Sequence, residues 1–103
     1  MAWICDRTVT VRTDVAALDA VLAALSDSTR RAVYRRLRRS PGLTTGQLSE
    51  LTRGMTRWGV MKHLAVLRQA GLVQTLHDGR NRRHYADAGR LQLVRDWLDE
   101  AAR

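Results

Sequence analysis

The spacing of the apolar residues constrains the fold of this chain more than any other sequence feature. In five stretches they recur every three or four residues, which is the repeat of an α-helix with one buried face. One further stretch, residues 73–86, has the composition of paired β-strands. The predicted helices begin near Val15, Asp27, Thr44, Thr56 and Leu91. The predicted fold class is therefore mainly α, with about five helices and a two-stranded β-hairpin.

Capping and turn signals mark where these elements begin and end. Thr44 and Gln47 have the spacing of a capping box at a helix start. Gly71 follows the last apolar residue of the fourth helix, where a left-handed residue ends a helix. Residues 78–81, with Asp-Gly at their centre, are typical of a tight hairpin turn. The predicted strands on either side are residues 73–77 and 82–86.

The charge balance favours nucleic acid as the partner. Among 103 residues, 18 are basic and 10 acidic, which leaves a net charge of +8, and every basic residue except Lys62 is arginine. The guanidinium group pairs bidentately with phosphate, so nucleic acid is favoured over an acidic membrane surface or an acidic protein. The length suffices for one domain. We assign residues 16–103 to that domain and residues 1–15 to an N-terminal arm or edge strand.

Several classes of protein are disfavoured by the same sequence. No apolar run has the length of a membrane span, and Asp6 and Arg7 interrupt the region where a signal peptide would be apolar. We therefore expect a cytoplasmic protein with no membrane partner. The single cysteine, Cys5, cannot form an intrachain disulfide or supply a structural zinc site. No nucleophile–base arrangement or glycine-rich phosphate loop is recognisable, so we expect no catalytic residues and no enzyme activity.

The third and fourth helices, joined by residues 52–55 and followed by the hairpin, have the order of a helix-turn-helix with a wing. In such a protein the fourth helix enters the major groove of DNA and the hairpin reaches the backbone or the minor groove. The residues expected to contact DNA are Thr56, Arg57, Trp58, Met61, Lys62, Arg68, Arg80, Arg82 and Arg83. For Trp58, packing against the second helix is an equal alternative.

Four segments carry a family resemblance, residues 24–31, 47–51, 60–64 and 66–73. On these the chain resembles the ArsR-type winged-helix transcriptional repressors of bacteria, over about residues 16–103. The resemblance implies a homodimer, formed by the first and last helices, that represses its own operon. Two broad apolar helix faces favour a dimer as well, and two-fold symmetry predicts an inverted-repeat operator in double-stranded DNA. The expected interface residues are Leu18, Val21, Leu22, Leu25, Leu91, Val94, Trp97 and Leu98.

Two departures from the family pattern affect the expected ligands. Metal-sensing members carry paired cysteines on the third helix or histidines on the last, and residues 45–51 and 91–103 contain neither. We therefore expect the metal-independent branch, with no metal, no cofactor and an unknown inducer. Trp58 and Met61 stand where the family commonly has small polar residues. His77 and His84 are expected to face each other across the hairpin, and a metal ion between them is disfavoured.

Other readings of the sequence stay open. A winged helix can serve as a protein-interaction module or as a nonspecific architectural DNA-binding protein. Arg30 and Arg31 follow a helix N-terminus, where cations are unfavourable, so a DNA phosphate or a carboxylate within the fold is expected to compensate them. His63 lies in an apolar stretch and is interpreted as a structural, hydrogen-bonding residue.

Overall fold

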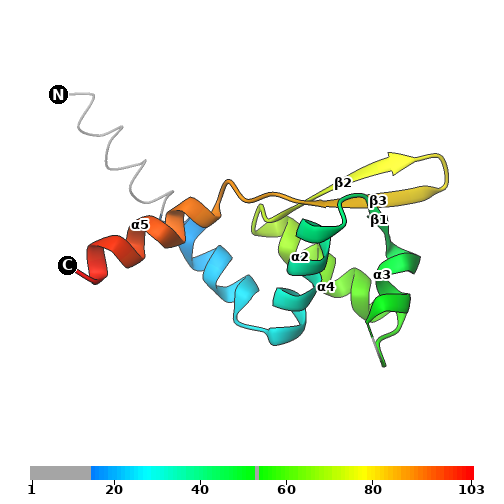
Figure 1. Cartoon of the computed structure of the whole chain (residues 1–103), viewed down its shortest axis with the longest axis horizontal. Helices are drawn as coiled ribbons and strands as arrows, with labels where there is room; N and C mark the ends of the chain where they lie inside the picture. Colours follow the sequence, from blue (N-terminus) through cyan, green and yellow to red (C-terminus); the bar gives the residue numbers. More distant parts are fainter. Residues whose placement is uncertain (1–14, 53) are drawn as a thin grey trace.

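The computed structural model describes residues 15–52 and 54–103 as helices around a small antiparallel sheet (Figure 1). Residues 15–25 are helical (helix 15–25), and no helix in the described ranges is both long and apolar enough to cross a membrane. The later helices are α2 (Ser28–Arg39), α3 (Thr45–Leu51), α4 (Arg57–Gln69) and α5 (Leu91–Ala101). The strands are β1 (Leu43–Thr44), β2 (Val73–Asp78) and β3 (Asn81–Ala86). This is the predicted, mainly helical winged helix-turn-helix. Cys5 and residues 1–14 of the predicted arm lie outside the described residues.

Local side-chain hydrogen bonds set the starts of the helices. The backbone N–H of Gln47 donates to Thr44 Oγ1 at 3.2 Å, and the Thr44 N–H donates to Gln47 Oε1 at 2.9 Å. Thr56 Oγ1 accepts from the N–H of Gly59 at 3.0 Å at the start of α4. Each bond satisfies an N–H group that the helix itself leaves unpaired. The predicted capping box is confirmed, and Thr56 caps α4 at the helix start that the sequence predicts.

The end of α4 turns the chain directly into the sheet. Gly71 has a φ of +77°, a conformation that favours glycine. The Leu72 N–H donates to the Leu67 carbonyl at 2.9 Å, and the Gly71 N–H donates to the Arg68 carbonyl at 2.9 Å. These two bonds make a Schellman motif, as Gly71 predicts. Because β2 begins at Val73, α4 and the hairpin are joined without a flexible linker.

The sheet differs from the prediction in its turn and in its number of strands. Asp78 pairs with Asn81, so Gly79 and Arg80 occupy the turn, one residue later than the predicted Asp-Gly centre. Gly79 has a φ of +61°, as the first position of a type II′ turn requires. A short third strand, β1, pairs with β3, and the strand order is β1–β3–β2. Two residues are too few to show a strand pattern in the sequence.

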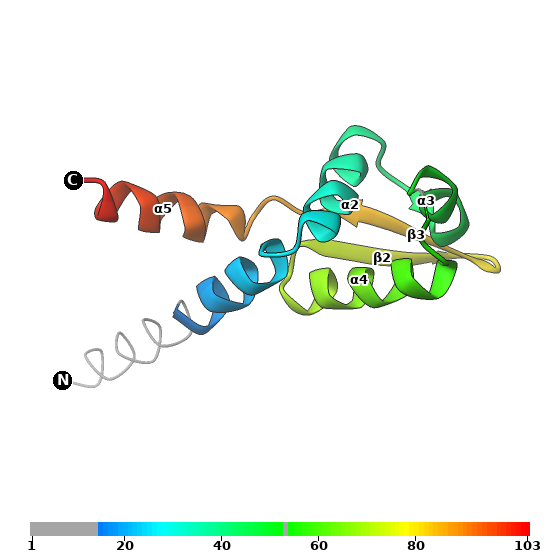
Figure 2. The same ribbon diagram turned by 90° about the horizontal axis from the view of Figure 1, so that it is seen from below.

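One apolar core joins helix 15–25, α2, α3, α4 and the start of β2. Its largest fully buried apolar side chains are Leu37, Leu48, Leu64, Leu67, Leu72, Val21 and Val60. Figures 1 and 2 place α3 and the hairpin tip at the end of the molecule opposite to helix 15–25 and α5. The core therefore supports two separate surfaces, one at each end.

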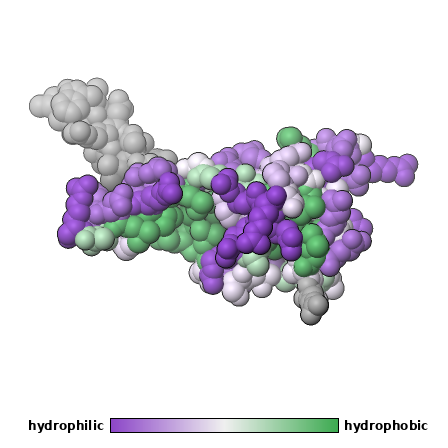
Figure 3. All heavy atoms as spheres, viewed as in Figure 1, coloured by the Kyte–Doolittle hydropathy of each residue, from purple (hydrophilic) through white to green (hydrophobic). Residues whose placement is uncertain are grey.

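Helix 15–25 and α5 project from one end of the molecule and leave apolar side chains uncovered. No residue of α5 is buried. Figure 3 shows hydrophobic side chains gathered along this end. Leu22, Trp97 and Leu98 are 42–52% exposed. Such a face is typical of a surface that another chain covers.

The predicted interface residues divide into three groups by exposure. Leu22, Trp97 and Leu98 are exposed, and Leu18 is half-buried. Leu25, Leu91 and Val94 are half-buried because they also pack against the core. Val21 has no exposed surface at all, which corrects the prediction that it lies in the interface. Val21 faces the core of its own chain, whereas its neighbour Leu22 faces solvent.

Candidate nucleic-acid interface

The solvent-facing side of α4 carries most of the residues predicted to bind DNA. Val60, Leu64 and Leu67 are buried and hold the helix on the core. The opposite side therefore presents polar, basic and large apolar groups to solvent. Its exposed side chains include Thr56, at the cap, and Arg57, Trp58, Met61, Lys62 and Arg68.

Trp58 stands away from the core. It is 65% exposed, so the alternative that it packs against α2 is wrong. The Lys62 ammonium lies 3.7 Å from the centroid of the Trp58 ring, one helical turn further along α4. This is a cation–π contact, which favours one orientation of both side chains.

A cleft of about 210 Å³ lies between the start of α4 and the hairpin. Arg57 reaches it from α4, Arg80 from the turn and Arg82 from β3. Met61 and Thr45 also line it. In residues 15–52 and 54–103, no carboxylate lies within 4.0 Å of any of the three guanidinium groups. The cleft is therefore cationic, with its charges uncompensated inside the described part of the chain.

Arg83 and Arg68 are not part of this cleft. Neighbouring residues of a strand point to opposite faces, so Arg82 and Arg83 diverge. Arg83 Nε donates to Asp78 Oδ2 at 2.8 Å, and its Nη1 donates to the Gly42 carbonyl at 3.0 Å. Arg68 Nη1 lies 3.5 Å from Thr75 Oγ1 on β2. Arg83 therefore holds the hairpin to the Gly42 backbone, whereas Arg68 lies beside β2.

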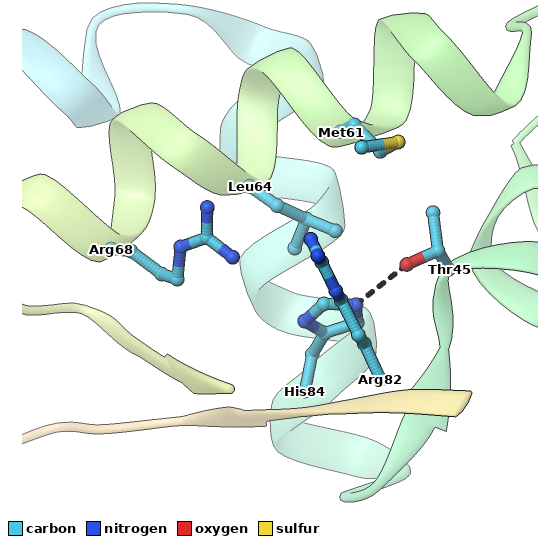
Figure 4. A pocket seen from close by; sticks show the side chains of 6 residues that line it. All are labelled: Thr45, Met61, Leu64, Arg68, Arg82 and His84. Carbon is cyan, nitrogen blue, oxygen red and sulfur yellow. Dashed lines mark hydrogen bonds between the residues drawn. The ribbon is translucent and has the colours of Figure 1, made fainter. Parts of the chain in front are cut away.

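His84 fastens the hairpin to the helix-turn-helix (Figure 4). It is 1% exposed, with its Nε2 2.8 Å from Thr45 Oγ1 of α3 and its Nδ1 2.8 Å from Thr75 Oγ1 of β2. Burial, then the charges of Arg68 and Arg82, lower the pKa of His84 to about 4. The ring is therefore neutral at pH 7. A cavity of about 20 Å³ above it has room for one water molecule.

The predicted arrangement of the two hairpin histidines is wrong. His77 stands opposite Arg82, and His84 stands opposite Thr75. Both ring nitrogens of His84 already have hydroxyl partners. Within the described ranges, no group of three or more histidine, cysteine or acidic residues is placed to hold a metal ion. The sequence gives no sign of the role of His84, because its Thr45 partner is 39 residues away.

Arg30 and Arg31 are compensated inside the fold. Arg30 Nε donates to the Ala24 carbonyl at 2.7 Å, and Arg30 Nη1 lies 3.2 Å from Asp27 Oδ2. Arg31 Nη1 donates to the Leu25 carbonyl at 2.6 Å. Both arginines therefore donate hydrogen bonds to carbonyls at the C-terminus of helix 15–25, where positive charge is favourable.

Asp27 also connects α2 to the helix that carries the cleft. His63 Nδ1 of α4 lies 3.4 Å from Asp27 Oδ2, on the side of α4 away from the hairpin. His63 is half-buried there. This is a structural contact, as the sequence predicts for His63.

The chain is similar in sequence to known helix-turn-helix proteins. Residues 25–75 match a family model described as a helix-turn-helix domain. The chain is 38% identical over 69 residues to an uncharacterised HTH-type transcriptional regulator, YuzN, of Bacillus subtilis (strain 168), with 62% of this chain and 75% of that protein covered. The matched segment 25–75 contains α2, α3, α4 and the first residues of β2.

Two solved structures resemble most of the chain. A crystal structure of an ArsR family transcriptional regulator has a TM-score of 0.76 and 34% identity, and the match covers 84% of this chain and 87% of that one. An ArsR-like transcriptional regulator from Rhodococcus sp. RHA1 has a TM-score of 0.73 and 31% identity, with 85% and 81% covered. Both matches cover more of the chain than the segment 25–75 alone.

Proposed function

The chain belongs to the ArsR family of transcriptional regulators, DNA-binding proteins that are not enzymes, and on this basis we propose that it represses its own operon as a homodimer on an inverted-repeat operator. One observation carries the proposal. Arg57, Arg80 and Arg82 converge on a single cleft between α4 and the hairpin, without a carboxylate partner in the described residues. Three uncompensated guanidinium groups fit a phosphodiester backbone.

In the proposed complex, α4 lies in the major groove and the hairpin follows the adjacent backbone. Arg57, the first residue of α4, is at the end of the helix that reaches furthest toward the base edges. Arg80, at the tip of the turn, extends to phosphate or into the minor groove. The backbone strand between the two grooves then passes along the cleft.

The proposed dimer joins two copies through the same end of each, the end remote from the hairpin tip. Residues 16–103 form the DNA-binding and dimerisation domain, and the exposed faces of helix 15–25 and α5 pack across a two-fold axis. Leu22, Trp97 and Leu98 are the central contacts, since they are the exposed members of the predicted set. Two-fold symmetry spaces the two α4 helices by about 34 Å, one turn of duplex.

The test is competition between the duplex upstream of the chain's own gene and unrelated DNA of equal length and base composition. A specific repressor binds the upstream duplex at least about 10³-fold more tightly. Equal affinity for both duplexes indicates a nonspecific architectural protein, and binding to neither indicates a protein-interaction module. Arg95→Ala, which removes an α5 arginine remote from the cleft, is the control for a general loss of charge.

A further inference from the structure

An apolar strip lies on the exposed side of α4 between its basic residues. It consists of Trp58, Met61 and Ala65, spaced three and four residues apart on one side of the helix. Trp58 is 65% exposed and Met61 is 44% exposed. Both large side chains leave apolar surface that the fold does not cover, and this exposed surface points to a contact outside the chain.

The side chains around the strip define what that contact requires. Arg57 adjoins Met61 across the cleft, and Lys62 lies over the Trp58 ring. The described residues of α4 include no acidic side chain. The complementary surface must therefore carry negative charge around small apolar groups.

The major groove of DNA has this character. The 5-methyl group of thymine is the apolar group on its base edges, and phosphates border it on both sides. The Met61 side chain has no donor, and the Trp58 indole has a single N–H. Met61 and Trp58 are therefore suited to recognise a base by packing on its methyl group rather than by hydrogen bonds.

We propose that Trp58 and Met61 are specificity-determining residues that recognise thymine through its 5-methyl group. The inference rests on the proposed function and extends it to the base composition of the operator. Each half-site then contains thymine where the first two turns of α4 face the groove. Lys62, held against the ring, orients Trp58 for this contact and leaves its charge near the phosphates.

The experiment replaces single thymines by deoxyuridine, which removes the methyl group and leaves base pairing unchanged. The operator is first selected from a pool of random duplexes with the wild-type protein. Each thymine of one half-site is then replaced, and dissociation constants are measured for the wild type, Trp58→Ala and Met61→Ala. Loss of one buried methyl group is expected to weaken wild-type binding about fourfold, the equivalent of about 0.8 kcal/mol.

The variants identify which side chain reads which base. Trp58→Ala is expected to bind the thymine and uridine duplexes equally at one position, and Met61→Ala at another. Leu76→Ala is the matched control, because Leu76 is 60% exposed but lies on the hairpin face opposite to His84. This control is expected to keep the wild-type response to uridine at every position.

The possible failures are distinct. If binding is sequence-specific but no deoxyuridine substitution weakens it, only the inference about thymine is overturned. The same inference is overturned if Trp58→Ala and Met61→Ala both lose affinity on deoxyuridine substitution as the wild type does. If Trp58→Ala keeps full operator affinity, the strip belongs to a protein partner instead. If the selection yields no preferred duplex, both this inference and the proposed function are wrong.

Discussion

At the scale of single residues, His84 is the buried side chain that fastens the hairpin to the helix-turn-helix. It joins β3 to α3 and β2 through two hydroxyl contacts of 2.8 Å. Protonation would place a buried charge beside Arg68 and Arg82, which is why the pKa of His84 is lowered to about 4. The orientation of the hairpin relative to α4 therefore depends on a neutral imidazole.

This predicts a specific loss of stability in acid. The unfolded chain, with a histidine pKa of about 6.5, takes up the proton before the folded chain does. The stability due to neutral His84 is thus complete above pH 6.5 and falls as the pH drops toward 4, by roughly 3 kcal/mol. Urea unfolding at pH 7, 5 and 4 should show this extra loss in the wild type and not in His84→Gln. Parallel pH profiles for the two proteins would contradict the prediction.

At the scale of elements, α4 and the hairpin are expected to contribute to binding in different ways. Arg57 lies at the start of α4, the helix proposed to enter the groove, whereas Arg80 lies at the tip of the turn. Contacts to base edges discriminate between sequences, and contacts to phosphate do not. Both arginines line one cleft, so only their energetics separate the two roles.

Alanine variants of the two arginines test this division. Arg57→Ala should cost about 1–3 kcal/mol on the operator and relax the preference at one base pair per half-site. Arg80→Ala should weaken operator and random DNA alike, and lower the slope of log affinity against log salt by about 0.9 per phosphate contact. Titrations of both variants on both duplexes at several salt concentrations give the answer. The opposite pattern would mean that the hairpin reads minor-groove shape.

The elements of this fold are predictable from the sequence where their determinants are local. The Thr44–Gln47 capping box and the Gly71 helix end each involve residues only a few positions apart. In contrast, β1 exists because Leu43 and Thr44 meet β3, some 40 residues later. The turn register is fixed by the whole β2–β3 ladder, so the Asp-Gly signal alone is one residue off.

The candidate site is likewise predictable only where its determinants are local in the sequence. Periodicity identifies the exposed side of α4, because Val60, Leu64 and Leu67 mark the buried side. It cannot show that Arg82 reaches the cleft while Arg83 binds Asp78, since that depends on the register of the strands. Nor can it separate Val21, buried in its own chain, from the exposed Leu22 next to it.

At the scale of the whole molecule, the two surfaces proposed to bind DNA and a second copy lie at opposite ends. The hairpin tip and α3 are at one end, and helix 15–25 and α5 project from the other (Figure 2). The exposed apolar side chains of α5, Trp97 and Leu98, gain little from packing within their own chain. Pairing of two copies at this end would fix the distance between the two α4 helices, and with it the spacing of the half-sites.

A charge in the centre of this face tests the dimer and its role in DNA binding together. The wild type should scatter light as a particle of about 23 kDa, twice the 11.7 kDa of one chain, and Leu98→Lys as a single chain. Gln92→Lys, on the side of α5 turned away from Leu98, should remain dimeric because its new ammonium can pair with Asp96. Operator affinity should fall about 10²- to 10⁴-fold in Leu98→Lys, because each half-site is then bound independently. A wild type of about 12 kDa at micromolar concentration, or a monomeric Leu98→Lys with full operator affinity, would show that this face does not organise DNA binding.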